Sequence, residues 1–434
     1  MKFEKICVLG LGYIGLPTAS TFATHGLGVV GVDVNRHIVQ TLHQGGLHIH
    51  EPGLRTLVQA ALKSGHLTVS TQPEEADAFI IAVPTPFESA AEGAIPIKSA
   101  PKKADLSYVK SASQAIVPYL RRGNLVMLES TSPPLTTLDV VAPILEKSGL
   151  QAGRDFHLAY SPERVLPGQI LQELIENARV VGGIDRASAE AGRDLYKIFV
   201  RGEIICTTAT TAEMVKLMEN TYRDVNIAIA NEFSRLADRM GVDVWEVIEL
   251  ANRHPRVEIL RPGIGVGGHC ISVDPWFLVE AAPDITPLIH TARNVNDAQP
   301  QFVVEMLRRA LGTLSGKRIA ALGLAYKPDV DDLRESPAIA VARLMAQAGA
   351  DVIAYEPYKK DAHIEAITLT PSLDSAINGS DALVLLVAHT PLLKLTPEHV
   401  AALTESRLVV DTVNGWNPDP WEAADFRFIR LGVG

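Results

Sequence analysis

Two stretches of the chain repeat the same succession of short apolar runs, and this repeat constrains the fold more than any other feature. In each stretch the first run ends in glycine, the second run ends in an acidic residue, and two further apolar runs follow in the same order. Strand-like runs that alternate with helix-like segments predict a parallel, doubly wound sheet in each stretch. The paired runs are 6–10 with 319–323, 26–33 with 349–356, 77–86 with 381–391, and 125–130 with 408–412.

A long helix is predicted between the two repeated stretches, because no glycine or proline occurs from Ala209 to Met240. We therefore expect an α/β protein with two Rossmann-like doubly wound domains, joined by a central helical domain. Such a helix favours a homodimer interface, and the alternative is a buried connector within one chain. The expected domains are 1–205, 206–305 (the central helical domain) and 306–434.

Composition excludes several classes of protein. The 434 residues are 47% hydrophobic and allow two or three domains with ample cores. A net charge of −10 without a basic stripe argues against nucleic acid as a partner. We expect no membrane span, because no apolar run approaches the ~20 residues that one needs. We expect no signal peptide either, since the N-terminus enters a strand-like run at once. Three cysteines make no disulfide framework and favour the cytoplasm.

A dinucleotide fingerprint opens the first repeat. Gly10, Gly12 and Gly15 form G-x-G-x-x-G between a predicted strand and a predicted helix, the context in which this motif binds a pyrophosphate. Asp33 follows about 20 residues later, where a carboxylate holds the ribose hydroxyls of NAD and disfavours NADP. Arg36 is expected over the adenine. The motif and its acidic residue together predict NAD as the cofactor.

The second repeat lacks the complete fingerprint. After Gly323 there is no third glycine, and the interval to Glu356 is longer than the matching interval in the first repeat. The added residues form a charged loop that contains Lys327. We expect a different nucleotide here, with Lys327 at its phosphates, and the alternative is a solvated surface loop.

The segment 263–275, GIGVGGHCISVDP, is a glycine-rich loop in which backbone can approach a ligand closely. Cys270 lies in this loop and is a candidate nucleophile, although a free cysteine is also often structural. Cys7 lies within a predicted strand and Cys206 at a strand end, so both are interpreted as structural. The thirteen histidines show no ligand spacing, and no metal is expected.

Other polar residues have the spacing of a ligand site. Lys216, Asn220 and Arg223 share one face of the long helix, which is either a ligand-facing stripe or a solvated face. Glu163 and Arg164 follow a strand, where α/β sheets place their ligands. There Glu163 is a candidate general base, and Arg164 can pair with a carboxylate or phosphate. His254 and Arg256 precede the glycine-rich loop.

Seven segments together resemble the UDP-glucose/GDP-mannose dehydrogenase family, whose members oxidise a sugar alcohol to an acid with two NAD. The resemblance covers nearly the whole chain. The segments are GLGYIGLP (10–17), PTPF (84–87), ESTSPP (129–134), SPERVLPG (161–168), AEMVKLMENTYRDVNIAIANE (212–232), GVGGHCISVDPWF (265–277) and KPDVDDLRESPA (327–338).

The resemblance implies a covalent mechanism. Cys270 would trap the first oxidation product, an aldehyde, as a thiohemiacetal, and the second oxidation would leave a thioester for water to hydrolyse. Lys216 and Asn220 would stabilise the oxyanion, with Lys216 a candidate for proton transfer as well. Asp274 and Glu163 would activate the water.

The resemblance also assigns binding residues. The UDP-sugar would contact the chain at Arg164, Val165, Lys216, Asn220, Arg223, His254, Arg256, Gly267, Tyr326 and Lys327. His254 or Arg256 would be candidates to reach a neighbouring subunit. Besides the three glycines and Arg36, NAD would contact Tyr13, Ile14, Asp33, Thr85, Thr131 and Arg334.

The segments NRHPRV and DPWF are most similar to the family members that act on UDP-N-acetyl-D-mannosamine. UDP-N-acetylglucosamine and UDP-glucose are the alternative substrates. Two departures stand out: an Ala/Pro/Lys-rich insert at 88–103, and Asn414 where similar enzymes carry a basic residue near the sugar. A two-electron dehydrogenase and a non-catalytic NAD-binding module are the alternatives outside this family.

Overall fold

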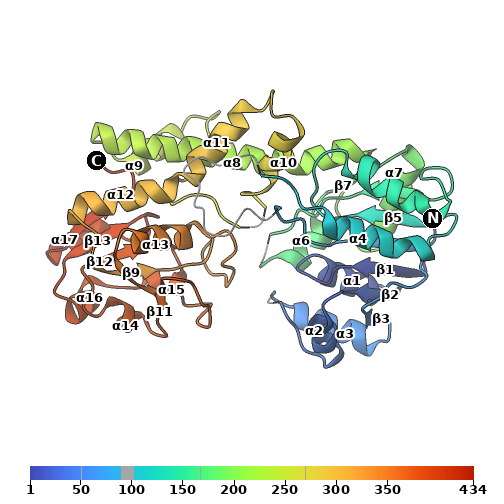
Figure 1. The fold of residues 1–434 in the computed structure, drawn as a ribbon, viewed down its shortest axis with the longest axis horizontal. Coiled ribbons are helices and arrows are strands. Elements are labelled where there is room, and N and C mark those ends of the chain that lie inside the picture. Colours follow the sequence, from blue (N-terminus) through green and yellow to red (C-terminus); the bar gives the residue numbers. More distant parts are fainter. Residues whose placement is uncertain (50, 89–101, 167, 269) are drawn as a thin grey trace. The chain divides into compact units, whose positions relative to one another are not determined.

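The computed structural model describes residues 1–49, 51–88, 102–166, 168–268 and 270–434 (Figure 1). These residues form two compact units, one made of 1–88 and 102–219 and the other of 220–434. Most of the predicted insert at 88–103 lies outside the described residues. At its ends, the Glu88 amide donates a 2.9 Å hydrogen bond to the Lys103 carbonyl.

In the described part of the first unit, eight strands form one sheet in the order β3-β2-β1-β4-β5-β6-β7-β8. The strands from β3 to β6 are parallel, as predicted. They are β1 (Lys5–Leu9), β2 (Gly28–Val32), β3 (Leu67–Ser70), β4 (Ala78–Ile81), β5 (Leu125–Leu128), β6 (His157–Tyr160), β7 (Arg179–Gly183) and β8 (Ile204–Thr208).

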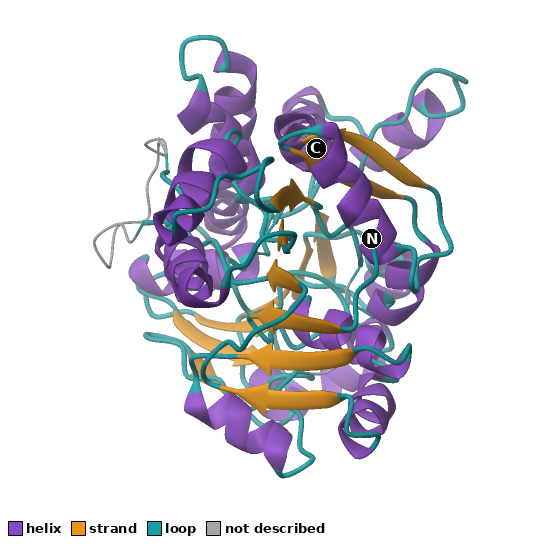
Figure 2. Cartoon of the chain, turned by 90° about the vertical axis from the view of Figure 1, so that its right-hand side faces the viewer, coloured by secondary structure: helices purple, strands orange, loops and turns teal. Residues whose placement is uncertain are grey.

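Helices cover both faces of this sheet (Figure 2), as a parallel sheet requires. They are α1 (Gly15–Thr24), α2 (Arg36–His43), α3 (Leu54–Lys63), α4 (Ser107–Ile116), η1 (Val117–Tyr119), η2 (Thr136–Val141), α5 (Ala142–Leu145), η3 (Glu146–Ser148), α6 (Ile170–Glu176) and α7 (Arg186–Tyr196).

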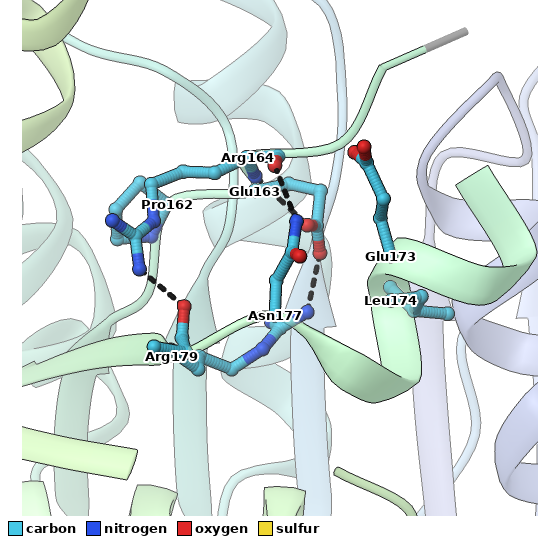
Figure 3. Close-up of a pocket in the computed structure, with 8 residues that line it drawn as sticks. Pro162, Glu163, Arg164, Glu173, Leu174, Asn177 and Arg179 are labelled. Carbon is cyan, nitrogen blue, oxygen red and sulfur yellow. Dashed lines mark hydrogen bonds and ion pairs between the residues drawn. The ribbon is translucent and has the colours of Figure 1, made fainter. Parts of the chain in front are cut away.

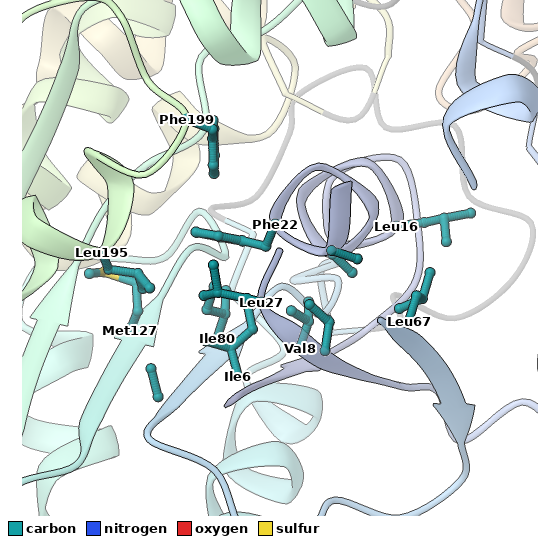
Figure 4. Packing of buried hydrophobic residues seen from close by; sticks show 14 of the residues in the cluster. Ile6, Val8, Leu16, Phe22, Leu27, Leu67, Ile80, Met127, Leu195 and Phe199 are labelled. Atoms are coloured by element: carbon teal, nitrogen blue, oxygen red, sulfur yellow. The ribbon is translucent and has the colours of Figure 1, made fainter. Parts of the chain in front are cut away.

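The core of the first unit lies between this sheet and its helices. Every residue of β4 and of β5 is buried, which explains why these strands read as continuous apolar runs. Figure 4 shows Phe22 of α1 beside Phe199, and their ring centroids lie 4.7 Å apart. The central strands are therefore covered on both faces and belong to the hydrophobic core of the unit.

The second unit contains the second repeat, with the strand order β11-β10-β9-β12-β13-β14 among its described residues. This order matches β3-β2-β1-β4-β5-β6, so the predicted repeat of the fold is confirmed. The strands are β9 (Arg318–Leu322), β10 (Asp351–Tyr355), β11 (Thr368–Leu369), β12 (Ala382–Leu385), β13 (Leu408–Asp411) and β14 (Arg427–Arg430).

The predicted long helix is α8 (Ala209–Met240), and more helices follow it. The domain boundaries at 205 and 305 stay a prediction. The other helices are α9 (Val244–Ala251), α10 (Asp274–Ala281), α11 (Pro287–Asp297), α12 (Gln299–Leu311), α13 (Pro337–Gln347), α14 (Leu373–Ile377), α15 (Thr390–Leu393), α16 (Pro397–Leu403) and α17 (Pro418–Ala423).

The structure differs from the sequence predictions at three places. Strand β7 runs antiparallel to β6, and the sheet is otherwise parallel. The helix-like pattern over 137–147 predicts one α-helix, and the segment is instead a π-helix followed by a short α-helix and a 3₁₀ turn. Cys206 lies in the middle of β8 and is exposed, because β8 is the edge strand of its sheet.

Candidate functional site

The three glycines of the first fingerprint have the backbone environments that their predicted roles require. Gly10 has a φ of +93°, and a Cβ there would lie 2.5 Å from the Ala82 carbonyl oxygen. A Cβ on Gly15 would lie 1.8 Å from the Gly10 carbonyl oxygen. A Cβ on Gly12 would meet no atom of the described residues within 4 Å, so a pyrophosphate can approach the backbone there.

Asp33 follows β2 and holds the glycine loop. Its Oδ2 accepts a 3.0 Å hydrogen bond from the Leu11 amide, and its Oδ1 accepts a 2.9 Å bond from the Asn35 amide. The side chain is half-buried, so it combines a fixed position with access for a ribose. Arg36 is exposed at the start of α2, and Tyr13 and Ile14 are half-buried beside Gly12.

Two other predicted NAD contacts lie in direct contact with each other. Thr85 Oγ1 donates a 2.6 Å hydrogen bond to the Thr131 carbonyl, which joins the loops after β4 and β5. The loop after β5 is also held by Glu213 of α8, a buried residue that sequence reasoning missed. Its carboxylate accepts hydrogen bonds of 2.7 and 2.8 Å from the amides of Leu135 and Thr137. These loops are fixed at the carboxyl edge of the sheet.

Glu163 and Arg164 line a pocket that follows β6 (Figure 3). Glu163 Oε1 accepts a 2.8 Å hydrogen bond from the Arg164 amide, and its Oε2 pairs with Arg179. Arg164 Nη1 pairs with Glu219 of α8 at 2.8 Å. Arg179 was missed by sequence reasoning, because no local pattern marks a residue that starts a strand.

Carboxylates also hold the rest of this loop. Glu173 accepts a 2.7 Å hydrogen bond from the Leu166 amide. The buried Glu51 accepts 2.9 Å hydrogen bonds from the amides of Gly168 and Ile170. Val165 packs against the hydrophobic core of the unit. The loop that contains Glu163 is therefore ordered by side chains from distant parts of the chain.

In the second unit the glycine-rich loop leads directly into α10. The Cys270 carbonyl accepts hydrogen bonds from the amides of Val273 and Asp274, at 2.9 and 2.8 Å. Asn220 Nδ2 donates a 2.5 Å hydrogen bond to Asp274 Oδ2, so two predicted catalytic residues are joined. Lys216 is buried one helical turn before Asn220 on α8.

The glycine-rich loop packs closely against the charged loop of the second repeat. A Cβ on Gly268 would lie 2.8 Å from the Tyr326 ring, and the Gly268 amide donates a 3.3 Å hydrogen bond to the Arg334 carbonyl. A Cβ on Gly267 would lie 2.6 Å from the Glu335 carbonyl oxygen. Lys327 Nζ is 5.8 Å from the Tyr326 ring centroid. Gly267, Tyr326, Lys327 and Arg334 therefore gather in the second unit.

Arg223, His254 and Arg256 are exposed. The loop that contains His254 and Arg256 is held to α8 by Asn226, whose Nδ2 donates a 3.1 Å hydrogen bond to the Glu258 carbonyl. The Arg256 amide donates a 3.4 Å hydrogen bond to His254 Nδ1. The roles of the three residues stay predictions.

Glu356 occupies the position in the second repeat that Asp33 has in the first, but it is fully enclosed. It accepts hydrogen bonds of 2.7 and 3.0 Å from the amides of Leu324 and Ala325, and it lies 3.1 Å from His389 Nε2. Burial favours a higher pKa for Glu356, but these donors outweigh it and lower the pKa. The second repeat thus has no exposed acid for a ribose at this position.

Asn414 follows β13 in a left-handed conformation with a φ of 53°. Arg430 Nη1 donates a 2.9 Å hydrogen bond to Asn414 Oδ1, and Arg430 also pairs with Asp243. A basic group from the neighbouring strand β14 therefore lies beside Asn414.

In the part of the chain that the structure describes, no cluster of three or more His, Cys, Asp or Glu could hold a metal ion. A search of the helices in the same residues finds none with the length and apolar character to cross a bilayer.

Three family models match successive parts of the chain. They are the NAD binding domain (residues 4–200), the central domain (210–298) and the UDP binding domain (320–418) of one family. The chain belongs to the UDP-glucose/GDP-mannose dehydrogenase family. The first repeat is thus the NAD-binding domain and the second the UDP-binding domain. As a family member, the protein is an NAD-dependent nucleotide-sugar dehydrogenase.

Similar proteins span the full length of the chain. A UDP-N-acetyl-D-mannosamine dehydrogenase of Methanocaldococcus jannaschii is 47% identical, covering 99% of this chain and 97% of that protein. An NDP-N-acetyl-D-galactosaminuronic acid dehydrogenase of Ralstonia nicotianae is 48% identical, covering 96% and 97%. The solved UDP-D-ManNAc dehydrogenase of Pyrococcus horikoshii has a TM-score of 0.90 at 41% identity, covering 99% and 100%.

Proposed function

We propose that this protein oxidises UDP-N-acetyl-D-mannosamine at C6 to UDP-N-acetyl-D-mannosaminuronate, a donor for surface polysaccharides. The observation that carries this proposal is the full-length similarity to UDP-N-acetyl-D-mannosamine dehydrogenases, at 47% identity for the Methanocaldococcus protein. The NAD-binding loop supports it, since the open approach to Gly12 and the position of Asp33 fit a dinucleotide.

NAD bound at this loop would accept a hydride from C6 in each of two successive oxidations. We propose that the Cys270 thiolate adds to the aldehyde of the first oxidation, which makes a thiohemiacetal with a C–S bond. The second oxidation leaves a thioester. Lys216 and Asn220 donate hydrogen bonds to the oxygen that becomes negative at C6.

Water then hydrolyses the thioester. Glu163 or Asp274 takes the proton from the attacking water, the C–S bond breaks, and the electron pair leaves on the sulfur of Cys270. The buried hydrogen bond from Asn220 to Asp274 supports a shared role for these two residues. Arg164, Val165, Arg223, His254, Arg256, Gly267, Tyr326 and Lys327 are proposed to hold the UDP-sugar, and Thr85, Thr131 and Arg334 to contact NAD.

A substrate panel tests the proposal. Purified protein is given UDP-N-acetylmannosamine, UDP-N-acetylglucosamine, UDP-N-acetylgalactosamine and UDP-glucose, and NADH absorbance and the acid product are measured together. We expect the highest kcat/KM for UDP-N-acetylmannosamine and two NADH for each sugar consumed. One NADH per sugar would contradict the four-electron oxidation, and preference for another sugar would contradict the substrate.

We also propose that the protein is a cytoplasmic homodimer assembled through α8. None of its three cysteines forms a disulfide, which suits a reducing compartment. Large apolar side chains recur along one face of α8 at helical spacing and are exposed, up to 67% at Met240. On α9, Val247 and Leu250 are also exposed. The members of the stripe on α8 are Met218, Tyr222, Ile229, Phe233, Leu236 and Met240.

Charges in this stripe should prevent assembly. The double variant Tyr222→Glu/Leu236→Glu should sediment as a monomer, because two carboxylates would be buried without partners. The wild type should sediment as a dimer. Leu393→Glu, the same kind of change at an exposed leucine of α15, is the control and should leave the dimer intact. A double variant that still sediments as a dimer would refute an interface on this face.

A further inference from the structure

A buried arginine, Arg179, forms an ion pair with Glu163. Arg179 is 4% exposed, and it pairs with Glu163 through Nη2. Its Nη1 lies 3.3 Å from Glu129 Oε1, and its guanidinium lies 4.1 Å from the centre of the Tyr196 ring. Tyr196 donates a hydrogen bond to the same Glu129 oxygen. Figure 3 shows the arginine and Glu163 turned toward each other across the pocket.

The antiparallel strand explains why an arginine reaches this place. Strands β4, β5 and β6 are parallel, so the residues after them, including Glu129 and Glu163, stand at one edge of the sheet. Strand β7 runs the other way, with Tyr160 paired to Gly182. Its first residue, Arg179, therefore stands at that same edge. A parallel β7 would place Arg179 at the opposite edge.

The charges in this cluster are unequal. The guanidinium of Arg179 pairs with the carboxyl groups of both Glu129 and Glu163. All three side chains are buried, where a net negative charge costs free energy. Burial raises the pKa of Glu129 to about 7, against the lowering effect of Arg179. Burial also raises the pKa of Tyr196 well above its usual value, so Tyr196 remains a donor to Glu129. Arg179 therefore compensates the charge of Glu129 and Glu163 together.

The guanidinium also has a geometric advantage over an ammonium. Its planar fork reaches Glu129 and Glu163 at once while its face lies on Tyr196, and a lysine offers one point charge. The second oxygen of Glu163 is held by the Arg164 amide at 2.8 Å. Both oxygens of Glu163 are therefore fixed in direction.

We propose that Arg179 is a positioning residue for Glu163, and that Glu129 and Tyr196 fix Arg179 in turn. The proposal rests on the proposed function, and of its two candidate bases it takes Glu163 as the group that accepts the proton of the water that hydrolyses the Cys270 thioester. In that step an O–H bond of water breaks, a C–O bond forms, and the C–S bond breaks with its electron pair on sulfur. Arg179 acts on this step only through the direction and charge of Glu163.

Arg179→Lys tests the proposal. We expect kcat to fall about 10–100-fold, since a small misplacement of a reacting group has this effect. The kcat/KM values for UDP-sugar and NAD should stay within about 3-fold, because the steps up to the thioester are unchanged and only the hydrolysis after them is slowed. A rapid burst of two NADH per active site should precede slow turnover, and intact-protein mass spectrometry should show the substrate bound to Cys270. Arg193→Lys on α7, which pairs with Asp194 near the surface, is the matched control and should behave as wild type.

A second pair of variants separates positioning from stability. Arg179→Met leaves two carboxyl groups without their cation and is expected to lower Tm. Arg179→Met/Glu129→Gln removes one of those carboxyl groups, so we expect Tm to recover toward wild type while kcat stays at least about 10-fold low. If the double variant recovered both Tm and kcat, the role of Arg179 would be purely structural and the proposal would be overturned. An Arg179→Lys enzyme that shows no burst of NADH would also overturn it. The wild-type enzyme in the same assays tests the proposed function separately. If the wild type forms no uronic acid, the proposed function is wrong, independently of the results for the Arg179 variants.

Discussion

Replacing Cys270 with alanine should abolish formation of the uronic acid. The proposed second oxidation needs a thiohemiacetal, and without the Cys270 sulfur no covalent intermediate can form. We expect the rate of acid formation to fall about a thousand-fold or more, as is typical when a covalent nucleophile is removed. NAD binding should be unchanged, because the glycine fingerprint and Asp33 belong to the first unit.

The other two cysteines provide the contrast for this experiment. Burial in β1 raises the pKa of Cys7 to about 12, so its thiol stays protonated at neutral pH. Burial also raises the pKa of Cys206, although less strongly, and its Sγ lies 3.6 Å from the Ala189 carbonyl. Cys206→Ala should therefore turn over like the wild type. Acid formation by Cys270→Ala at a near-normal rate would rule out the covalent mechanism, and NADH and acid measured together decide it.

Replacing Arg293 with methionine should strongly destabilise the second unit. Arg293 of α11 is 1% exposed, and it pairs with Asp224 of α8, which is fully buried, at 2.5 Å. Asn296 donates a 2.8 Å hydrogen bond to the same carboxylate oxygen. Removing one partner of a buried ion pair leaves an uncompensated charge, which costs about 3–5 kcal/mol in free energy of unfolding. Urea denaturation measures the loss.

The pH dependence of this loss has a definite sign. Burial raises the pKa of Asp224 even with Arg293 beside it. An aspartate whose folded pKa is raised binds its proton more tightly in the folded state, so stability falls as pH rises through that range. The deficit of Arg293→Met should therefore be smaller at pH 5 than at pH 8. Asp224→Asn/Arg293→Met should recover part of the stability, because no charge remains buried.

Arg308→Met provides the matched control on α12. Its pair with Glu305 is solvent-exposed, with side chains 43% and 48% accessible, and such pairs contribute less than about 1 kcal/mol. Equal losses for Arg293→Met and Arg308→Met would show that burial of the Arg293 pair has no special weight. The network also reaches the glycine-rich loop. Asn231 bonds to Asn296 at 2.9 Å and accepts a 2.9 Å hydrogen bond from the Gly263 amide.

Features carried by local spacing could be predicted from the sequence. The three glycines and Asp33 belong to one strand–turn–helix–strand unit, and that unit forms as predicted because its contacts are nearly all local. The long helix and the repeated sheet order follow equally well from apolar runs and the absence of helix breakers. Cys206 is predicted at a strand end, but it lies in the middle of β8, because the bounds of that strand depend on its pairing with β7 and not only on the residues around the cysteine.

The sequence by itself thus determined the two nucleotide folds, the NAD fingerprint and Cys270 as the candidate nucleophile, since each depends on residues close together in the chain. Only the tertiary structure decided that β7 is antiparallel and brings Arg179 to Glu163, and that Arg293 pairs with Asp224. The physical reason is that buried charges choose partners across distant elements. Their pairing depends on strand direction and helix packing, which no local spacing encodes.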